Sequence, residues 1–144
     1  MRNEVVIAIA EDDPGHAALI ERNLRRAGIQ NELELFADGQ EVLDFFFGTG
    51  PRTRRPDTPY LLLLDIRMPK VDGVEVLARV KADEELRKVP VIMLTTTDDP
   101  REIERCHALG CSHYITKPVD YDSFVGVLRQ LGLFLLVVQV PAIR

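Results

Sequence analysis

Three carboxylates follow two apolar runs of the sequence, and their positions suit metal binding. Glu11 and Asp12 come directly after the run 5–10 (VVIAIA), and Asp65 comes directly after the run 60–64 (YLLLL). Continuous apolar runs of this length are typical of strands buried on both faces of a parallel sheet. The carboxyl ends of such strands meet at one edge, so we expect the three acids to lie together. Oxygen ligands without histidine or thiolate select a hard cation, which predicts a Mg²⁺ site.

A magnesium site of this kind points to phosphoryl chemistry. Mg²⁺ usually takes one or two carboxylates and completes its shell with water and phosphate oxygens. Asp65 could then attack phosphorus as a carboxylate nucleophile. Thr95 and Lys117 follow two further predicted strands, and there they offer a hydroxyl donor and a flexible positive charge to the phosphoryl oxygens. An X–Pro bond adopts the cis form at modest cost, and a cis Lys117–Pro118 bond would aim the lysine inward.

The elements that must position these residues alternate between strands and helices. Apolar patterning predicts strands at 5–10, 32–36, 60–64, 90–94 and 113–115, and helices that begin after Pro14, near Val42, near Val74, near Asp99 and at Asp120, the last ending at Leu131. Parallel neighbours need crossover connections, and helices supply them. The pattern therefore predicts an α/β fold with a doubly wound, five-stranded parallel sheet and a C-terminal apolar extension.

Length and composition fit one domain and exclude several classes of protein. The chain has 144 residues, of which 46% are hydrophobic, and its net charge of -5 gives no electrostatic case for binding nucleic acid. The charged residues 1–4 lead into no cleavage site, and the longest apolar stretch, 131–140, is far shorter than the ~20 residues that span a bilayer. Cys106 and Cys111 fit neither a redox motif nor a zinc site. We expect a soluble, cytoplasmic protein that binds neither nucleic acid nor membranes.

Four motifs, in this order and spacing, resemble the receiver domain of two-component response regulators. They are EDDP at 11–14, LLLLDIRMPKVDG at 61–73, PVIMLTT at 90–96 and YITKP at 114–118. The resemblance extends from residue 5 to about residue 131. It implies the flavodoxin-like strand order 2-1-3-4-5. It also implies a signalling switch rather than an enzyme: a stand-alone domain that takes a phosphoryl group from a sensor histidine kinase, assists its own phosphorylation and dephosphorylation, and signals through protein contacts.

The resemblance implies roles for the residues around the expected Mg²⁺. Asp65 is the implied phosphoacceptor. Asp12 is the implied direct metal ligand, joined by Asp65 and by the backbone carbonyl of Arg67, whereas Glu11 reaches the metal through water. Arg67 and Thr96 occupy positions that in similar receivers tune how fast the aspartyl phosphate hydrolyses, and Thr96 is also expected near the phosphoryl group.

Further residues of the motifs are implied to bind the phosphoryl group or to respond to it. Lys117 is expected to contact the phosphoryl group. Thr95 and Tyr114 are implied to form the switch pair that moves on phosphorylation. By contrast, we expect Asp13 to be a solvent-facing residue at a helix N-terminus, where negative charge is favoured. We expect His16 to face solvent and assign it no function.

The alternative from a different class is a magnesium-dependent phosphohydrolase of the haloacid-dehalogenase type. Such enzymes also use a strand-end aspartate, a threonine or serine, and a lysine. They resemble D-x-D, whose second aspartate is a general acid, but Arg67 stands at that place here and cannot release a proton at neutral pH. The chain also lacks room for a substrate cap. A DNA-binding output domain is not expected, because nothing after Leu131 could form a helix-turn-helix.

The segment 48–59 (GTGPRTRRPDTP) breaks the compact alternation of strands and helices. We interpret it as a long, solvated surface loop, with an anion or partner contact as the less favoured alternative. This loop and the apolar tail resemble response regulators that are paired with cyanobacterial and bacterial phytochromes. The implied partner is therefore a sensor histidine kinase of the phytochrome class.

The C-terminal end divides the chain into a receiver domain, 1–132, and an apolar arm, 133–144. Apolar residues fall on both faces of the arm, so folding it back on one chain would leave one face in water. Exposed apolar patches of this kind promote association. Pairing with the same segment of a second chain is the commonest symmetric solution. The sequence therefore predicts a homodimer held partly by residues 133–140.

Overall fold

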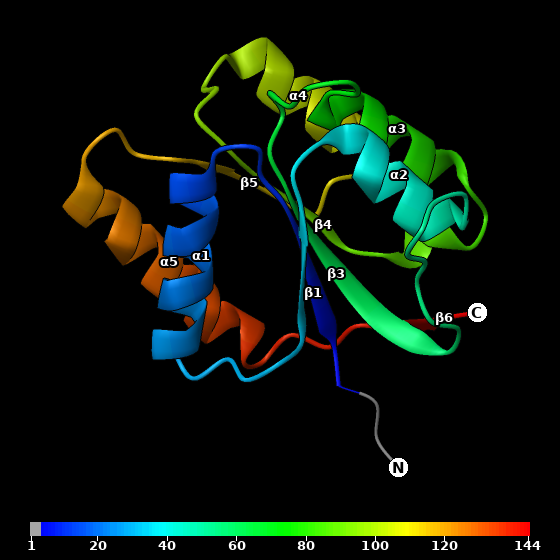
Figure 1. Ribbon diagram of the computed structural model, residues 1–144. Coiled ribbons are helices and arrows are strands. Elements are labelled where there is room, and N and C mark those ends of the chain that lie inside the picture. Colours follow the sequence, from blue (N-terminus) through cyan, green and yellow to red (C-terminus); the bar gives the residue numbers. More distant parts are fainter. Residues whose placement is uncertain (1–3) are drawn as a thin grey trace.

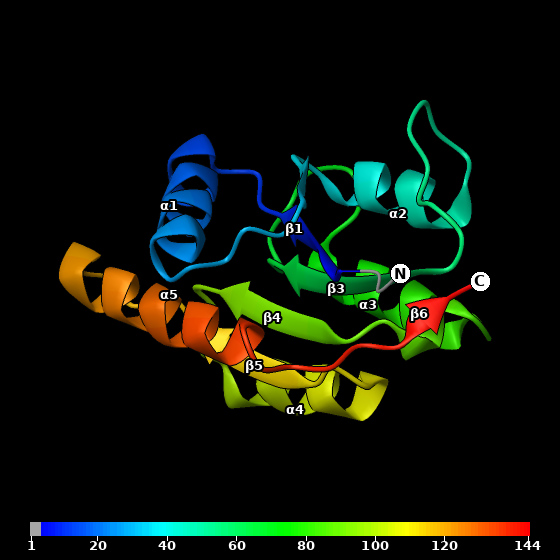
Figure 2. The same cartoon turned by 90° about the horizontal axis from the view of Figure 1, so that it is seen from below.

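The computed structural model describes residues 4–144 as a central parallel sheet between two layers of helices (Figures 1 and 2). The elements, in chain order, are β1 (Val6–Ala10), α1 (Pro14–Arg26), β2 (Leu33–Phe36), α2 (Gly39–Phe47), β3 (Thr58–Leu64), α3 (Gly73–Ala82), the 3₁₀ helix η1 (Leu86–Lys88), β4 (Val91–Thr95), α4 (Pro100–Leu109), β5 (His113–Thr116), α5 (Tyr121–Leu135) and β6 (Ala142–Ile143). None of the helices described is long and apolar enough to cross a membrane. The N-terminal segment that we excluded as a signal peptide lies mostly outside the described residues.

The strand order confirms the predicted doubly wound sheet. The strands run in the order β2-β1-β3-β4-β5, and all neighbours along this path are parallel. In the register of the central pair, Ala10 lies beside Leu64. Glu11 and Asp65 each follow one of these residues, so the register alone brings their backbones to the same edge of the sheet.

The two central strands have apolar side chains on both faces, and each face has its own layer of helices. Along β1, Val6, Ala8 and Ala10 contribute to one core cluster, and Ile7 and Ile9 contribute to the other. The first cluster lies under α2, α3 and α4, and the second lies under α1 and α5 (Figure 1). This two-sided burial explains why β1 reads as a continuous apolar run.

An aspartate caps each of the five α-helices in the described part of the chain. Each cap accepts a hydrogen bond from at least one backbone N–H of the first helical turn, and the five caps are Asp13, Asp38, Asp72, Asp99 and Asp120. A side-chain cap of this kind typically contributes about 1 kcal/mol. The caps define where the helices begin, just beyond the strand ends that carry the candidate site.

The arginines of the expected solvated loop pair with residues of their own chain. Arg55 forms an ion pair with Glu32 at 2.9 Å, and Arg52 forms one with Glu34 at 3.1 Å. The Arg52 guanidinium also lies over the Phe36 ring, 4.3 Å from its centroid. These contacts fold the loop against β2, the edge strand of the sheet. Strand β3 begins at Thr58, so the loop is two residues shorter than predicted.

The C-terminal segment differs most from the expected layout. Helix α5 continues to Leu135 rather than ending at Leu131, so the arm begins inside this helix. The chain then crosses below the sheet, and β6 pairs antiparallel with the start of β3 (Figure 2). Ile143 is only 1% exposed and belongs to the core. The last residues therefore pack on their own chain, although Leu136 and Val137 remain exposed.

Candidate functional site

The structure brings the three expected carboxylates together. Ligand oxygens of Glu11, Asp12 and Asp65 all lie within 4.8 Å of one another. Glu11 and Asp65 are buried at the ends of β1 and β3, whereas Asp12 is exposed. The cluster thus has a buried floor and one carboxylate open to solvent, as expected for acids at the carboxyl edge of a doubly wound sheet.

Lys117 is buried in the same site and neutralises part of its negative charge. Its ammonium group donates hydrogen bonds to Glu11 Oε1 and, at 3.1 Å, to Asp65 Oδ2. The backbone N–H of Lys117 donates to the carbonyl of Thr95 at 2.7 Å, which holds the residue beside the end of β4. No peptide bond between described residues is cis, so the cis Lys117–Pro118 bond that the sequence allows is not formed. The extended lysine side chain reaches the acids from a trans backbone.

In the part of the chain that the structure describes, the site holds three carboxylates but only one lysine, so its negative charge is not fully balanced. The pKa of Glu11 is raised to about 7: burial raises it most, the hydrogen bond from Lys117 lowers it, and the nearby Asp65 raises it. Asp65 Oδ1 is buried and has no hydrogen-bond partner among the described residues. A buried carboxylate oxygen without a partner is costly. A divalent cation near these oxygens would lower this cost and reduce the repulsion among the acids, so the donor set fits such an ion.

The loop from β3 to α3 packs closely under Asp65 and requires a glycine. A Cβ atom at residue 73 would lie 2.0 Å from the carbonyl oxygen of Asp65, which is far inside van der Waals contact. The N–H of Gly73 donates to the carbonyl of Ile66 at 2.7 Å. This close approach holds the start of α3 against the backbone of the candidate nucleophile. Arg67 is exposed within this loop, and Thr96 is exposed in the loop that follows β4.

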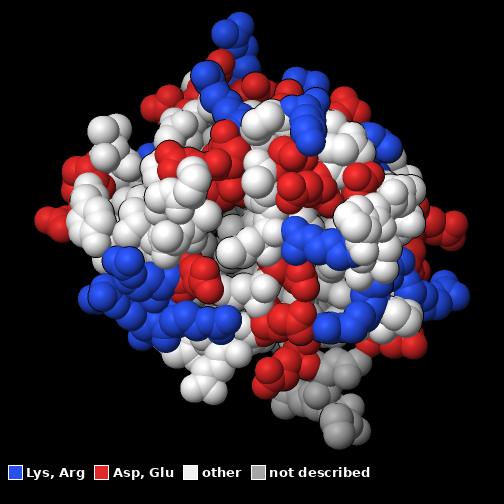
Figure 3. Space-filling view, in the orientation of Figure 1, with Lys and Arg blue, Asp and Glu red and all other residues white. Residues whose placement is uncertain are grey.

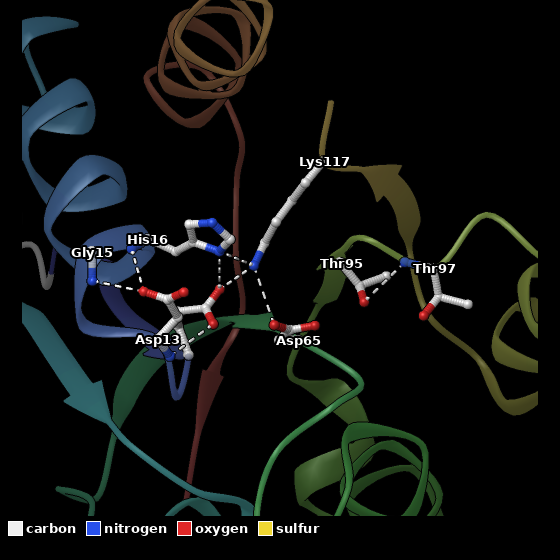
Figure 4. A network of polar contacts seen from close by, with 8 residues as sticks. Asp13, Gly15, His16, Asp65, Thr95, Thr97 and Lys117 are labelled. Carbon is white, nitrogen blue, oxygen red and sulfur yellow. Dashed lines mark hydrogen bonds and ion pairs between the residues drawn. The ribbon is translucent and has the colours of Figure 1, made fainter. Parts of the chain in front are cut away.

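Thr95 and Tyr114 are linked through one loop residue. Thr95 is fully buried, and its hydroxyl accepts from the N–H of Thr97 at 3.5 Å. The Tyr114 hydroxyl donates to the carbonyl of the same Thr97 at 2.7 Å. Burial raises the pKa of Tyr114 to about 12, so this phenol keeps its proton at neutral pH. In Figure 4, Thr95 lies on the other side of Asp65 from Lys117.

His16 is the site neighbour that the sequence interpretation missed. Its Nδ1 atom lies 3.2 Å from Lys117 Nζ, and its ring packs edge-on against Phe124 with the centroids 5.5 Å apart. The ring is 35% exposed and so faces solvent in part, but its Nδ1 edge faces the site, which we did not expect. A signal was present, because residue 16 lies four positions before Ile20 and eight before Leu24, on the buried face of α1. Asp13, by contrast, is an exposed helix cap, as expected.

Comparisons with known proteins agree with this geometry. The family model of the response regulator receiver domain matches residues 7–129. A response regulator receiver domain from Rhodospirillum rubrum is 47% identical and superposes with a TM-score of 0.90 over 96% of this chain and 99% of that one. The Mn²⁺-bound form of Rcp1, a response regulator of Synechocystis, has 30% identity and a TM-score of 0.87 over 95% and 99% of the two chains.

A third similar structure is that of the phosphorylated cyanobacterial phytochrome response regulator RcpA. It is 30% identical, with a TM-score of 0.85 over 94% of this chain and 97% of that chain. This chain belongs to the response regulator receiver domain family. It is a phosphorylation switch of two-component signalling, in which an aspartate accepts the phosphoryl group. The haloacid-dehalogenase alternative is not supported, because both the family match and the fold are those of receivers.

On the face shown in Figure 3, acidic and basic side chains are interspersed, and the most compact group of Lys and Arg lies over the end of α1. The last turn of that helix carries Arg25 and Arg26. Receivers of this family take their phosphoryl group from sensor histidine kinases and bind Mg²⁺ or Mn²⁺ at an acidic pocket.

Proposed function

We propose that Asp65 is the phosphoacceptor of this receiver. The observation that carries the proposal is its buried Oδ1 atom, which has no hydrogen-bond partner among residues 4–144, while Oδ2 accepts from Lys117. One oxygen is thus held by a positive charge, and the other is available for reaction. An Asp65 oxygen forms the new O–P bond while the P–N bond of a phosphohistidine breaks, and the imidazole takes up a proton as it leaves.

The cofactor in this proposal is Mg²⁺. Asp12 and Asp65 bind it directly, the backbone carbonyl of Arg67 supplies a third ligand, and Glu11 acts through water. The support is the position of the three acids within 4.8 Å and their oxygen-only chemistry. When bound, the ion neutralises charge on the transferring phosphoryl group. The exposure of Asp12 suits an ion that keeps several waters.

The remaining polar residues bind the phosphoryl group and respond to it. Lys117 donates to one phosphoryl oxygen, and the hydroxyl of Thr95 donates to another, with Thr96 beside it in the same loop. Thr95 moves toward the new group, and the shift reaches Tyr114 through Thr97, which contacts both side chains. The protein is a switch that assists its own phosphorylation and dephosphorylation, and its output is this change of surface.

The partners in this proposal are a sensor histidine kinase of the phytochrome class and a second copy of the chain. RcpA, a similar structure, is described as a phytochrome response regulator. Support for the homodimer comes from the arm 133–144, where Leu133, Leu136 and Val137 are 53%, 50% and 75% exposed. Pairing these side chains across a two-fold axis would remove them from water.

The phosphoacceptor proposal is tested by incubating the protein with acetyl phosphate and Mg²⁺ and measuring its intact mass. We expect one phosphoryl adduct on the wild-type chain and none on Asp65→Asn, which replaces the nucleophile with an isosteric amide. Asp13→Asn is the matched control, because it changes a neighbouring exposed aspartate that caps α1. Equal labelling of wild type and Asp65→Asn would refute the assignment.

A further inference from the structure

The ammonium group of Lys117 has three N–H donors, and the structure provides an acceptor near each. Two acceptors are carboxylate oxygens of Glu11 and Asp65, from the ends of β1 and β3. The third is the imidazole Nδ1 of His16, 3.2 Å away in the first turn of α1. In Figure 4 the lysine descends between the His16 ring and Asp65. An ammonium group donates and never accepts, so His16 Nδ1 must be the acceptor and Nε2 must carry the ring proton.

This third hydrogen bond has energetic weight because Lys117 is out of reach of water. Its side chain is 2% exposed, so bulk water cannot replace a lost acceptor. A buried donor left unpaired carries the full cost of desolvation. His16, at 35% side-chain exposure, forms the outer wall over the ammonium group. The backbone of His16 is fixed by its N–H, which donates to the Asp13 cap, and the ring packs edge-on against Phe124 of α5.

The three acceptors differ in strength, and that difference gives His16 a specific role. Hydrogen bonds between ions are stronger than those between an ion and a neutral group. When a phosphoryl group arrives on Asp65, its oxygens compete for the ammonium protons. The hydrogen bond from the ammonium group to the uncharged imidazole is the one that breaks at least cost. His16 can thus hold the lysine without binding it so tightly that the lysine cannot turn to phosphate.

We propose that His16 is a positioning residue for Lys117. In the resting state it accepts a hydrogen bond from the third ammonium N–H, which directs the other two N–H groups toward Glu11 and Asp65. When the phosphoryl group arrives, that third N–H leaves His16 and donates to a phosphoryl oxygen. The inference rests on the proposed function of Asp65 and Lys117 and adds a residue of α1 to that machinery. Because the same ring packs on Phe124, the position of α5 influences the orientation of the Lys117 side chain.

The test uses two substitutions that separate the acceptor from the ring. His16→Leu removes the acceptor and keeps an apolar side chain against Phe124. His16→Asn removes the ring and keeps an acceptor, because its Oδ1 can occupy the place of Nδ1. His107→Leu, an exposed position on α4, is the matched control. Each full-length protein is labelled with acetyl phosphate at saturating Mg²⁺, and the rate of Asp65 phosphorylation is followed by intact mass.

We expect His16→Leu to slow phosphorylation about fivefold, because the lysine without its third acceptor is less often oriented toward Asp65, and His16→Asn to restore most of the rate. The second readout is the ¹H–¹⁵N signal of the Lys117 ammonium group in lysine-labelled protein. The chemical shift of this signal should change in His16→Leu, because one ammonium N–H loses its acceptor, and should stay close to the wild-type value in His16→Asn and His107→Leu. A merely structural role for the ring would instead make the asparagine variant as defective as the leucine variant.

The outcomes separate this inference from the proposed function. If the wild-type chain takes no phosphoryl group at Asp65, the proposed function fails, whatever the variants do. If the wild type is labelled and His16→Leu matches it in both rate and ammonium signal, His16 does not position the lysine. If His16→Asn is as slow as His16→Leu, the acceptor role is refuted even though the site is correct.

Discussion

Neighbouring acidic residues of the first loop have different environments. Asp12 has an oxygen within the cluster of acids, whereas Asp13 turns back to cap α1 and accepts from the N–H groups of Gly15 and His16. Their identical chemistry therefore serves two different purposes. The hydrogen bonds that Asp13 accepts also lower its pKa, since they favour the ionised form.

The first prediction compares these two aspartates. Asp12→Ala should abolish Mg²⁺ binding and phosphorylation, because it removes a proposed direct ligand. Asp13→Ala should keep both functions and lose about 1 kcal/mol of stability, because it removes a helix cap. Metal titration by calorimetry, together with urea unfolding, measures both effects. Equal loss of Mg²⁺ binding in the two variants would show that the register of the acidic loop has been misassigned.

The second prediction concerns the coupling role of Lys117. Lys117→Ala should still be phosphorylated at Asp65, though more slowly, because the nucleophile and the metal ligands remain. The response of the β4–α4 loop to phosphate should be weak, because the charge that draws the phosphoryl group into the network is gone. Amide hydrogen exchange around Thr95 and Tyr114, before and after phosphorylation, is the measurement. A normal phosphate-dependent change in this variant would exclude the coupling role.

Much of the site could be predicted at the residue scale because it lies at strand ends. Glu11, Asp65 and Thr95 each follow or end a run whose apolar character is visible in the sequence, and the sheet then brings them together. His16 was missed because its helical spacing with Ile20 was outweighed by its polar type. The trans geometry of the Lys117 bond could not be predicted either, since local sequence leaves the isomer to the tertiary context.

At the scale of elements, the main surprise is the end of the chain. The five parallel strands and five helices could be predicted from apolar periodicity and from Asp, Gly and Pro at the element ends. Strand β6 could not, because two residues carry no periodicity and their pairing with β3 is a long-range contact. Helix α5 was predicted too short for a related reason: Gly132 resembles a helix stop, yet it lies inside the helix against the Ala27 side chain.

The third prediction tests the contribution of β6 to stability. Ile143→Ala should lower the free energy of unfolding by about 2–4 kcal/mol, because it leaves a cavity in a packed core. Val137→Ala, in the same segment but 75% exposed, should change stability by less than about 0.5 kcal/mol. Urea unfolding of both variants makes the comparison. Equal and small effects would mean that the C-terminal strand does not pack as described.

At the scale of the whole molecule, the arm combines a buried side with an exposed side. Leu135 and Ile143 pack into the domain, while Leu136 and Val137 remain in water. The arm folds back on its own chain and leaves one apolar face in water, as we expected for a folded-back arm. Burying the exposed face in a dimer would stabilise the assembly at roughly 25 cal/mol per Å² of apolar surface.

The fourth prediction is that the arm mediates dimerisation. Leu136→Glu combined with Val137→Glu should raise the dimer dissociation constant by at least about tenfold, because two charges would have to be buried in the contact. Val119→Glu, an exposed apolar position ahead of α5, is the control and should leave the equilibrium unchanged. Light scattering over a concentration series measures the dissociation constant. The prediction is refuted if the wild type is monomeric at micromolar concentration, or if the double variant dimerises equally well.

The most direct test of the central claim is to locate the phosphoryl group chemically. The wild-type protein is phosphorylated with acetyl phosphate and Mg²⁺ and treated at once with borohydride, which reduces an aspartyl phosphate to homoserine. Peptide mass spectrometry then identifies the residue that was converted. The proposed site predicts conversion at Asp65 alone, and none when Mg²⁺ is removed by a chelator. Conversion at Asp12 or at any other aspartate, or full conversion without a divalent cation, would contradict it.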